Sequence, residues 1–323
     1  MTARPHDALF KETFSDLANA RGELASVLPP AVSALVEWDT LRLEPGSFID
    51  DALRETMTDL LFSVRIEGRE ARLYLLFEHQ SSPDPLMPFR ALAYVVRIWE
   101  AWLQGHANAR RLPPVIPIVL AQVAGGWTSP TDLRSVVDFA DDIEREALHH
   151  WVPQCTVLVD DLAHLSNDAL DARAMPTAAK LILAALRDVR DADAVVDLVP
   201  AWARWIRALT RTPDGDAVLS TLVRYILFAR PAVDLPDLAA AVGAIDATAK
   251  ETIMSAGSEL IRQGEAKGRA EGRADMLLKL VTLRFPAISP EAAQRIRAAD
   301  AATLDRWAER ALTAASIEEL LAG

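Results

Sequence analysis

The sequence lacks the motifs that mark several common enzyme classes. A single cysteine in 323 residues excludes an intrachain disulfide framework and a cysteine zinc site. That residue, Cys155, lies in an apolar run, where we expect a buried thiol and not a nucleophile. No glycine-rich phosphate loop or serine hydrolase motif is present, and His149, His150 and His164 lack the spacing of a zinc protease helix. The chemistry must therefore come from other residues.

Long apolar runs are also missing. The longest, around residues 115–123, is too short to cross a bilayer, and the N-terminus carries His6, Asp7, Lys11 and Glu12 in place of an apolar signal core. We therefore expect a cytoplasmic protein without membrane association. A composition of 51% hydrophobic and 25% charged residues is typical of globular chains.

There is no excess of positive charge. The formal net charge of −12 argues against a broad basic surface for nucleic acid, so a DNA-directed function has to be reconciled with it. Most of the acidic excess lies in residues 128–255, and it is less marked in the N-terminal region where the candidate site is found.

A β-hairpin is predicted where two apolar segments, residues 59–66 and 71–78, flank a short polar stretch. We expect Gly68 and Arg69 to form its two-residue turn, of type II′. Alternation then makes one face wholly apolar, with Leu60, Phe62, Val64, Ile66, Leu73, Leu75 and Phe77, and leaves a mixed face.

This register places Asp59 directly opposite Glu78 on the mixed face, with Gln80 on the same side and His79 pointing away. Two carboxylates at ~5 Å repel by about 3 kcal/mol at an effective dielectric near 20, and a cation between them reverses that sign. Oxygen ligands of this kind suit Mg²⁺ or Mn²⁺. The alternative is that Asp59 merely starts one strand and Glu78 ends its partner at a solvated end of the sheet.

The remaining elements of residues 1–165 follow from apolar spacing. It predicts an opening helix over 6–28, an amphipathic helix over 85–105, and buried strands at 115–120 and 155–160. Together with the hairpin, this order predicts a mixed α/β sandwich.

Helical periodicity then dominates. We expect a helical extension over residues 166–256, and a glycine-repeat helix with a small helical module over residues 257–323. Gly264, Gly268 and Gly272 line one helix stripe, which would permit close approach of a second helix and self-association. A charged flexible connector is the alternative.

Residues 6–165 resemble a known family. The chain is similar to the Rpn-type recombination-promoting nucleases, also called YhgA-like putative transposases, of the PD-(D/E)XK nuclease superfamily. The C-terminal tail resembles a domain of unknown function often appended to these proteins. The N-terminal resemblance is carried by residues 6–11 (HDALFK), 58–61 (TDLL), 77–82 (FEHQSS), 87–90 (MPFR), Tyr94, 115–120 (VIPIVL) and Trp127.

The resemblance implies a restriction-endonuclease-like core, a mixed sheet flanked by helices, acting as a metal-dependent DNA endonuclease linked to recombination or mobile elements. It implies that Asp59 and Glu78 bind Mg²⁺ or Mn²⁺, and that Gln80 occupies the position where the wider superfamily has lysine. Glutamine brings no charge and can only orient water or phosphate through hydrogen bonds.

Another cation would have to substitute, and Arg90 and Lys11 are candidates, with Asp7 as a neighbour of the site. An ion pair or a solvated helix face explains Arg90 as well, and helix capping explains Asp7. A second hypothesis is a catalytically degenerate family member that acts as a DNA- or protein-binding assembly module.

Overall fold

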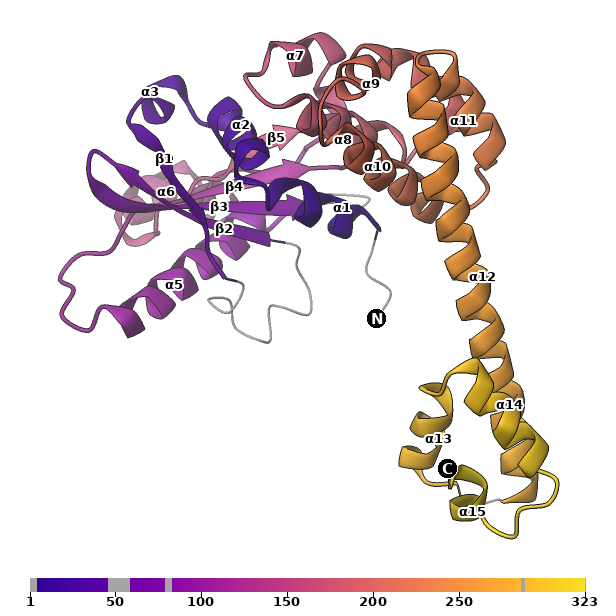
Figure 1. Ribbon diagram of the computed structural model, residues 1–323. Helices are drawn as coiled ribbons and strands as arrows, with labels where there is room; N and C mark the ends of the chain where they lie inside the picture. The colour runs from indigo at the N-terminus through magenta and orange to yellow at the C-terminus, as the bar shows by residue number, and fades with distance from the viewer. Residues whose placement is uncertain (1–4, 46–58, 79–82, 286–287, 323) are drawn as a thin grey trace. The chain divides into compact units, whose positions relative to one another are not determined.

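A computed structural model describes residues 5–45, 59–78, 83–285 and 288–322 of the chain. The chain divides into two compact units, Met1–Met254 and Ser255–Gly323. The first unit contains both the predicted α/β region and the helices that follow it (Figure 1).

The first unit is built on a five-stranded mixed sheet with the strand order β1-β2-β3-β4-β5. β1, β2 and β3 pair antiparallel, whereas β3, β4 and β5 run parallel. The predicted α/β class, a mixed sheet flanked by helices, is confirmed (Figure 1). The strands are β1 (Val36–Leu43), β2 (Asp59–Ile66), β3 (Arg69–Glu78), β4 (Val115–Ala121) and β5 (Leu158–Asp161).

The β2–β3 turn differs from the prediction. Ile66 pairs with Arg69, so the turn residues are Glu67 and Gly68, with φ angles of 49° and 73°. Positive φ at both positions is the signature of a type I′ turn. The predicted Gly68–Arg69 turn is wrong.

The register changes with the turn, and Asp59 pairs with Leu76, not with Glu78. Charge explains the difference. The observed pairing sets Arg65 opposite Glu70, whereas the predicted one would have set it opposite Arg72. Opposite charges across a strand pair stabilise it and like charges destabilise it.

One face of the sheet is covered by the N-terminal helices α1 (Pro5–Phe14) and α2 (Leu17–Val27) (Figure 1). The register error is an even number of residues, so the predicted alternation of faces survives it. Phe62, Leu73 and Leu75 of the apolar face are all fully buried.

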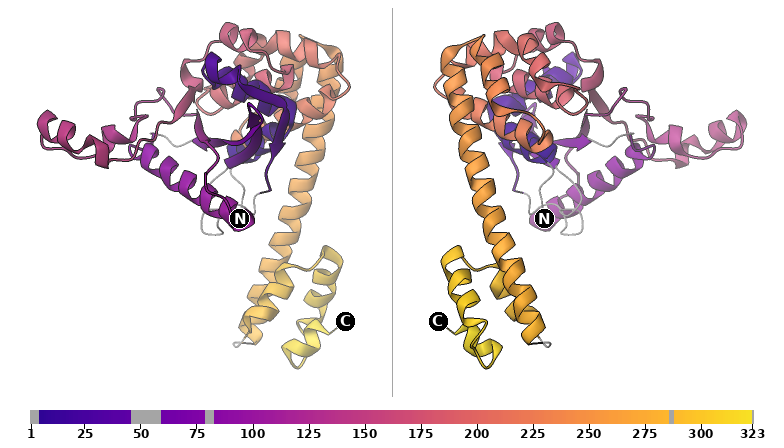
Figure 2. Two further views of the ribbon diagram at one scale, coloured as in Figure 1. Left: turned by 90° about the vertical axis from the view of Figure 1, so that its left-hand side faces the viewer. Right: turned by 90° about the vertical axis from the view of Figure 1, so that its right-hand side faces the viewer.

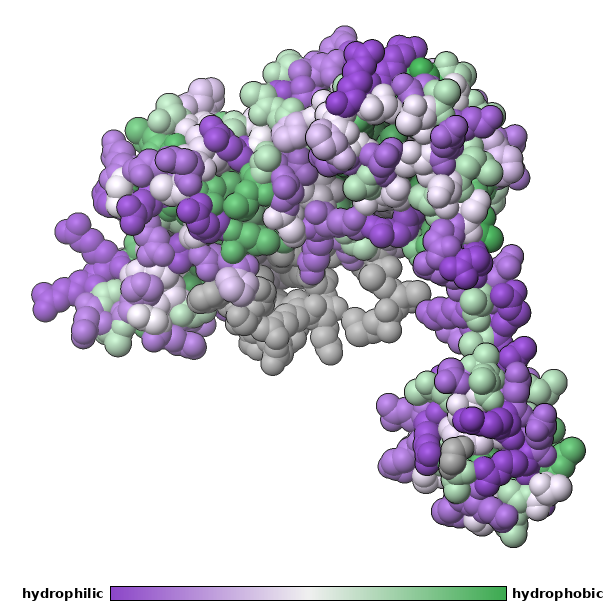
Figure 3. Space-filling view, viewed as in Figure 1, coloured by the Kyte–Doolittle hydropathy of each residue, from purple (hydrophilic) through white to green (hydrophobic). Residues whose placement is uncertain are grey.

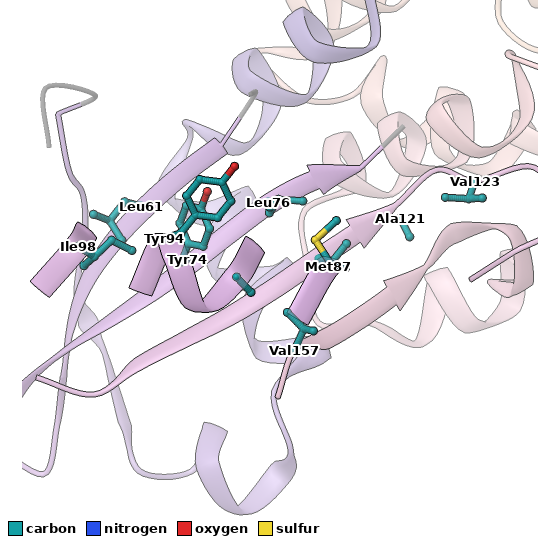
Figure 4. Close-up of a cluster of buried hydrophobic side chains, with 11 residues drawn as sticks. Leu61, Tyr74, Leu76, Met87, Tyr94, Ile98, Ala121, Val123 and Val157 are labelled. Carbon is teal, nitrogen blue, oxygen red and sulfur yellow. The ribbon is translucent and has the colours of Figure 1, made fainter. Parts of the chain in front are cut away.

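The opposite face is covered by α5 (Met87–Gly105), close to the predicted helix over 85–105. Figure 4 shows Leu61, Tyr74 and Leu76 of the hairpin beside Tyr94 and Ile98 of α5. The rings of Tyr74 and Tyr94 lie 5.5 Å apart. Among the described side chains, the mixed face is therefore apolar beneath α5, at Leu61, Tyr74 and Leu76, and polar nearer the turn, at Arg65 and Arg72.

The sequence prediction missed two features near the N-terminus. The opening helix is two helices, because the Asp16 carboxylate accepts hydrogen bonds from the backbone of Ala18 and Asn19 and begins α2 there. Strand β1 was not predicted, since Glu37, Asp39 and Arg42 interrupt its apolar pattern.

The rest of the first unit is mainly helical. α6 and its neighbour η3 project from it (Figure 2), and Ile143 and Trp151 there are 80% and 82% exposed. Residues 195–209 of the predicted helical extension form a 3₁₀ segment, η5, which contains Pro200, followed by α9. The elements are α3 (Pro30–Ser33), η2 (Leu133–Val136), α6 (Asp142–Leu148), η3 (His149–Trp151), η4 (Leu162–His164), α7 (Asn167–Ala172), α8 (Thr177–Asp188), η5 (Val195–Trp202), α9 (Ala203–Leu209), α10 (Gly215–Ala229) and α11 (Leu235–Gly243).

The second unit comprises most of α12 (Ala247–Arg284) with α13 (Pro290–Arg297), α14 (Ala301–Arg310) and α15 (Ile317–Leu321). Leu277, Ile296, Leu304, Trp307 and Leu320 form part of its own buried core. Arg284, the last residue of α12, joins that helix to the segment after α14 by donating to the carbonyl oxygens of Ala311 and Ala314, at 2.7 and 2.8 Å. In the described part of the chain, none of the helices combines the length and apolar character that a bilayer crossing needs.

A buried ionic cluster ties α2 to the sheet. Arg173 donates to both oxygens of Asp160 on β5, at 2.6 and 2.7 Å, and to Glu23 of α2 at 3.0 Å. Glu23 is fully buried. Burial, reinforced by the Asp160 carboxylate, raises the pKa of Glu23 well above its usual range. The Arg173 guanidinium thus binds the carboxyl groups of both Asp160 and Glu23, and Glu23 favours its protonated form.

Ionisation of Glu23 should oppose folding. Because its folded-state pKa is raised, its contribution to stability is full below the ordinary glutamate pKa and is lost as pH rises toward the folded-state value. Glu23→Gln keeps an oxygen for Arg173 without the charge. We expect the free energy of unfolding of Glu23→Gln, measured in urea titrations, to increase relative to wild type as the pH rises above the ordinary glutamate pKa. A difference that stays constant as the pH rises would contradict this account.

Candidate active site at the end of the sheet

The start of β2 and the ends of β3, β4 and β5 meet at one end of the sheet, which we call the C-terminal end. Asp59 is the first residue of β2 and Glu78 the last of β3, and Glu78 pairs with Ala121 of β4. The side chains of Asp59 and Glu78, and all of Gln80, lie outside the described residues. Strand pairing gives the backbone positions of the two acidic residues.

Those positions are diagonal neighbours. Asp59 pairs with Leu76, and Glu78 lies two residues farther along β3. Such neighbours are roughly 7–8 Å apart, against ~5 Å for a direct pair. The structure thus brings the two predicted carboxylate positions to adjacent strands at one end of the sheet, although not directly opposite each other.

The end of β3 is fixed by an aromatic stack. The ring of Phe10 on α1 lies parallel to that of Phe77, with centroids 4.8 Å apart and an interplanar angle of 5°. Phe10 is fully buried and also contacts Phe14 at 5.4 Å. The residue that precedes Glu78 is therefore held by α1.

Gln122 directly follows β4, and polar groups from distant segments of the chain contact it. Its side chain is 4% exposed and donates to the carbonyl oxygen of Leu186, while its amide nitrogen lies 3.5 Å from His6 Nδ1. The same histidine nitrogen is 2.9 Å from the hydroxyl of Tyr225 on α10. Burial raises the pKa of Tyr225, so its hydroxyl stays protonated.

Arg190, in the segment after α8, reaches the same place. Its Nη1 donates to the carbonyl oxygen of Gln122 at 3.1 Å, and its own carbonyl oxygen accepts from Arg230 Nη1 at 2.9 Å. The side chain is 23% exposed, and its Nε lies 4.0 Å from an Asp191 carboxylate that is 62% exposed. The Arg190 guanidinium is thus anchored beside Gln122, which follows Ala121, the strand partner of Glu78.

The other predicted site residues have varied surroundings. Arg90 forms an ion pair with Asp84 at 2.7 Å. Lys11 is exposed on α1. Asp7 lies within the first turn of α1, not at its cap, where a carboxylate interacts favourably with the helix dipole.

A pocket of about 350 Å³ adjoins the C-terminal end of the sheet, between the residues after β4 and those after α8. Arg187 and Asp188 in its lining are already joined to each other at 2.5 Å, and Asp188 also accepts from the indole of Trp202. Across the described ranges, no group of three or more His, Cys, Asp or Glu residues could hold a metal ion.

Cys155 is not a candidate nucleophile. It is partly buried against the core beneath α5, and burial raises the pKa of its thiol. The expectation of a structural thiol agrees with this environment.

Sequence reasoning missed Gln122, Arg190 and Tyr225. The one local signal was a polar residue directly after a predicted buried strand, which applies to Gln122. Arg190 and Tyr225 lie far along the chain in segments read only as helical, so no spacing connects them with the hairpin.

Residues 4–216 match the family described as "Putative transposase, YhgA-like". The chain belongs to this family. The match extends beyond residues 6–165, where the resemblance was expected to lie mainly, and includes Arg190. The helices as far as the start of α10 are thus part of the family region.

Several curated proteins are similar to the chain. Recombination-promoting nuclease RpnA of Escherichia coli (strain K12) is 42% identical over 120 residues, which are 36% of this chain and 40% of RpnA. The inactive recombination-promoting nuclease-like protein RpnE of the same strain is 28% identical over 281 residues, 86% of this chain and 89% of RpnE. The similarity to RpnA thus covers less than half of that protein, whereas the similarity to RpnE covers most of it. No solved structure matches the chain.

Removing the aromatic stack should destabilise the first unit. Phe10→Ala deletes a fully buried ring, and phenylalanine-to-alanine changes in cores cost about 3–5 kcal/mol. We expect a loss of that size in the free energy of unfolding by urea denaturation. Phe89→Ala, at a ring that is 57% exposed, should change it far less. Equal effects of the two substitutions would show that the stack does not hold the end of β3.

Proposed function

We propose that the protein is a metal-dependent DNA endonuclease that hydrolyses phosphodiester bonds and is linked to DNA recombination or mobile elements. The observation that carries the proposal is the β2–β3–β4 register, which sets Asp59 and Glu78 on adjacent strands at the C-terminal end of the sheet. Membership of the family and the names of RpnA and RpnC, both recombination-promoting nucleases, support it.

Asp59 and Glu78 are the proposed ligands of Mg²⁺ or Mn²⁺. The strand alternation that places Leu61, Tyr74 and Leu76 beneath α5 would direct both carboxylates to that side. The donor set fits, because Mg²⁺ is commonly held by one or two protein carboxylates together with water and substrate phosphate. When bound, such an ion lowers the pKa of a coordinated water and neutralises charge on a phosphodiester oxygen.

The chain's own residues would hold the ion, orient water or phosphate, and contact the substrate. The two carboxylates would hold the ion, and Gln80 would orient water or phosphate through its amide. Arg90 and Lys11 remain proposed substrate contacts, with Asp7 as a site neighbour. For Arg90, binding phosphate would require it to exchange or share its ion pair with Asp84.

A second candidate function is a degenerate family member that binds DNA or protein without cutting. Two observations favour it. The relative that aligns over 89% of its length, RpnE, is named inactive. The net charge of −12 also weakens non-specific attraction to DNA.

Substitution of either carboxylate distinguishes a nuclease from a family member that binds without cutting. In a plasmid nicking assay with Mg²⁺ or Mn²⁺, we expect the wild type to nick DNA, and Asp59→Ala and Glu78→Ala to be at least about 100-fold slower. Asp39→Ala removes an exposed carboxylate on β1 and should retain activity. Activity that persists in both site variants would refute the site, whereas an inactive wild type would favour the second function.

We also propose self-association through one face of α12. The helix is continuous through Gly264, Gly268 and Gly272, and the space where a Cβ would stand at each is open. Apolar Ile261 and Met276, 46% and 62% exposed, continue the stripe on either side. Each glycine costs about 1 kcal/mol relative to alanine inside a helix, which close packing against a second copy would offset. On the side of α12 seen in Figure 3, most of the side chains along the middle of the helix are hydrophilic.

Light scattering on the intact chain tests this association. We expect an oligomer for the wild type and a shift toward monomer for Gly268→Leu, because a bulky side chain would block close approach. Ala266→Leu changes an exposed position on the other side of α12 and should leave the mass unchanged. A monomeric wild type would contradict the proposal.

A further inference from the structure

We propose that two copies of the chain exchange arms, so that Trp151 of each copy enters a pocket beside the β2–β3 turn of the other. The arm comprises residues 138–154, which include α6 and η3. The inference goes beyond the proposed function and does not rest on nuclease activity, because it concerns the end of the sheet opposite Asp59 and Glu78.

The arm is an ordered projection (Figure 2). Two backbone hydrogen bonds of 2.9 Å close its base, one of them from the N–H of Leu133 to the carbonyl oxygen of Cys155. Farther out, the Asp141 carboxylate accepts from the backbone N–H of Glu144 at 2.8 Å and begins α6. A partner would therefore meet a largely preformed surface, which lowers the entropy lost on binding.

The tip of the arm is both apolar and acidic. Ile143, Leu148 and Trp151 are exposed, and exposed apolar groups of this size mark interaction sites. Residues 138–154 also hold five acidic residues and one arginine, which disfavours DNA and anionic lipid as the partner. The arm suits a protein surface that is hollow, apolar and basic, with Trp151 as its anchor.

Such a surface exists on the chain itself. A pocket of about 300 Å³ lies between the β2–β3 turn, the end of α5 and the segment before β4. Ile66, Trp102 and Leu112 contribute its apolar wall, and the exposed Arg69 and Arg111 also line it. The volume is at the lower end of the range for small-ligand sites, which suits one large side chain.

The charge of the pocket is opposite to that of the arm. Residues 66–72 and 110–114, which provide most of the lining, hold four arginines and two glutamates. One of the glutamates, Glu70, is bound by Arg72 at 2.6 Å and by the indole of Trp102 at 2.9 Å. An acidic arm therefore meets net positive charge, which favours docking and fixes its orientation.

The arm and the pocket lie at the same end of the sheet. β4 begins directly after the pocket residue Pro114, and β5 begins at Leu158, opposite Ile118 and just after the base of the arm. Two copies that meet at this end about a two-fold axis can exchange arms, because the combined surface is self-complementary. Since Trp151 is 82% exposed, its own copy does not bury it.

Sedimentation velocity of full-length proteins over a range of concentrations tests the exchange. Every protein, including the parent, carries Gly268→Leu, so that α12 does not hold copies together. The arm variant adds Ile143→Ser and Trp151→Ala, and the pocket variant adds Arg111→Glu and Leu112→Glu. All four positions are exposed, and melting temperature checks folding.

We expect the parent to dimerise, and each variant alone to dimerise at least about 30-fold more weakly, the loss typical of an interface hot spot. An equimolar mixture of the two variants should associate more tightly than either alone, because a mixed dimer keeps one complete arm–pocket contact. Raising the salt concentration should weaken the parent dimer. The matched controls Phe228→Ala and Arg21→Glu, at an exposed ring and an exposed arginine elsewhere, should resemble the parent.

A parent that stays monomeric, or a mixture that associates no better than its components, would overturn the exchange. Weak dimerisation of the arm variant beside normal dimerisation of the pocket variant would also overturn it, since the arm would then bind a different surface. If a double variant melts early, the single changes Trp151→Ala and Arg111→Glu decide in its place. The nicking assay tests the proposed function separately, so the two can fail independently.

Discussion

The two-residue turn between β2 and β3 is the constraint on which the candidate site depends. Glu67 and Gly68 both adopt positive φ, and the backbone N–H of Gly68 donates to the Glu37 carboxylate on β1 at 2.5 Å. This contact offsets the strain of Glu67 in the left-handed region. A slip of the register by one residue would turn the hairpin's apolar face outward, so the turn also protects the core.

The position of the candidate site follows from that register. Asp59, Glu78 and Gln122 come to one end of the sheet because β2 runs antiparallel to β3 and β4 runs parallel to it. His6 of α1 and Arg190 of the segment after α8 contact Gln122, and Tyr225 of α10 contacts His6. The family match as far as residue 216 agrees with a site that draws on both the sheet and the helices after it.

Local patterns predicted most elements but not their exact pairing. The α/β class, the faces of the hairpin and α5 follow from apolar periodicity, which is read from neighbouring residues. The turn was misjudged because glycine alone indicated its type, whereas the Arg65–Glu70 pairing and Glu37, 31 residues before Gly68, selected the register. The contact of Arg190 with Gln122 could not be predicted for the same reason, since only the tertiary fold brings Arg190 to the end of β4.

The central claim is that Asp59 and Glu78, as diagonal neighbours, share one divalent ion. Electron paramagnetic resonance of Mn²⁺ titrated into the protein without DNA tests this directly, because bound and free ions are counted regardless of activity. The account predicts a bound Mn²⁺ in the wild type that is lost in both Asp59→Asn and Glu78→Gln and retained in Asp39→Asn. Equal Mn²⁺ binding by the wild type and the two site variants would contradict it.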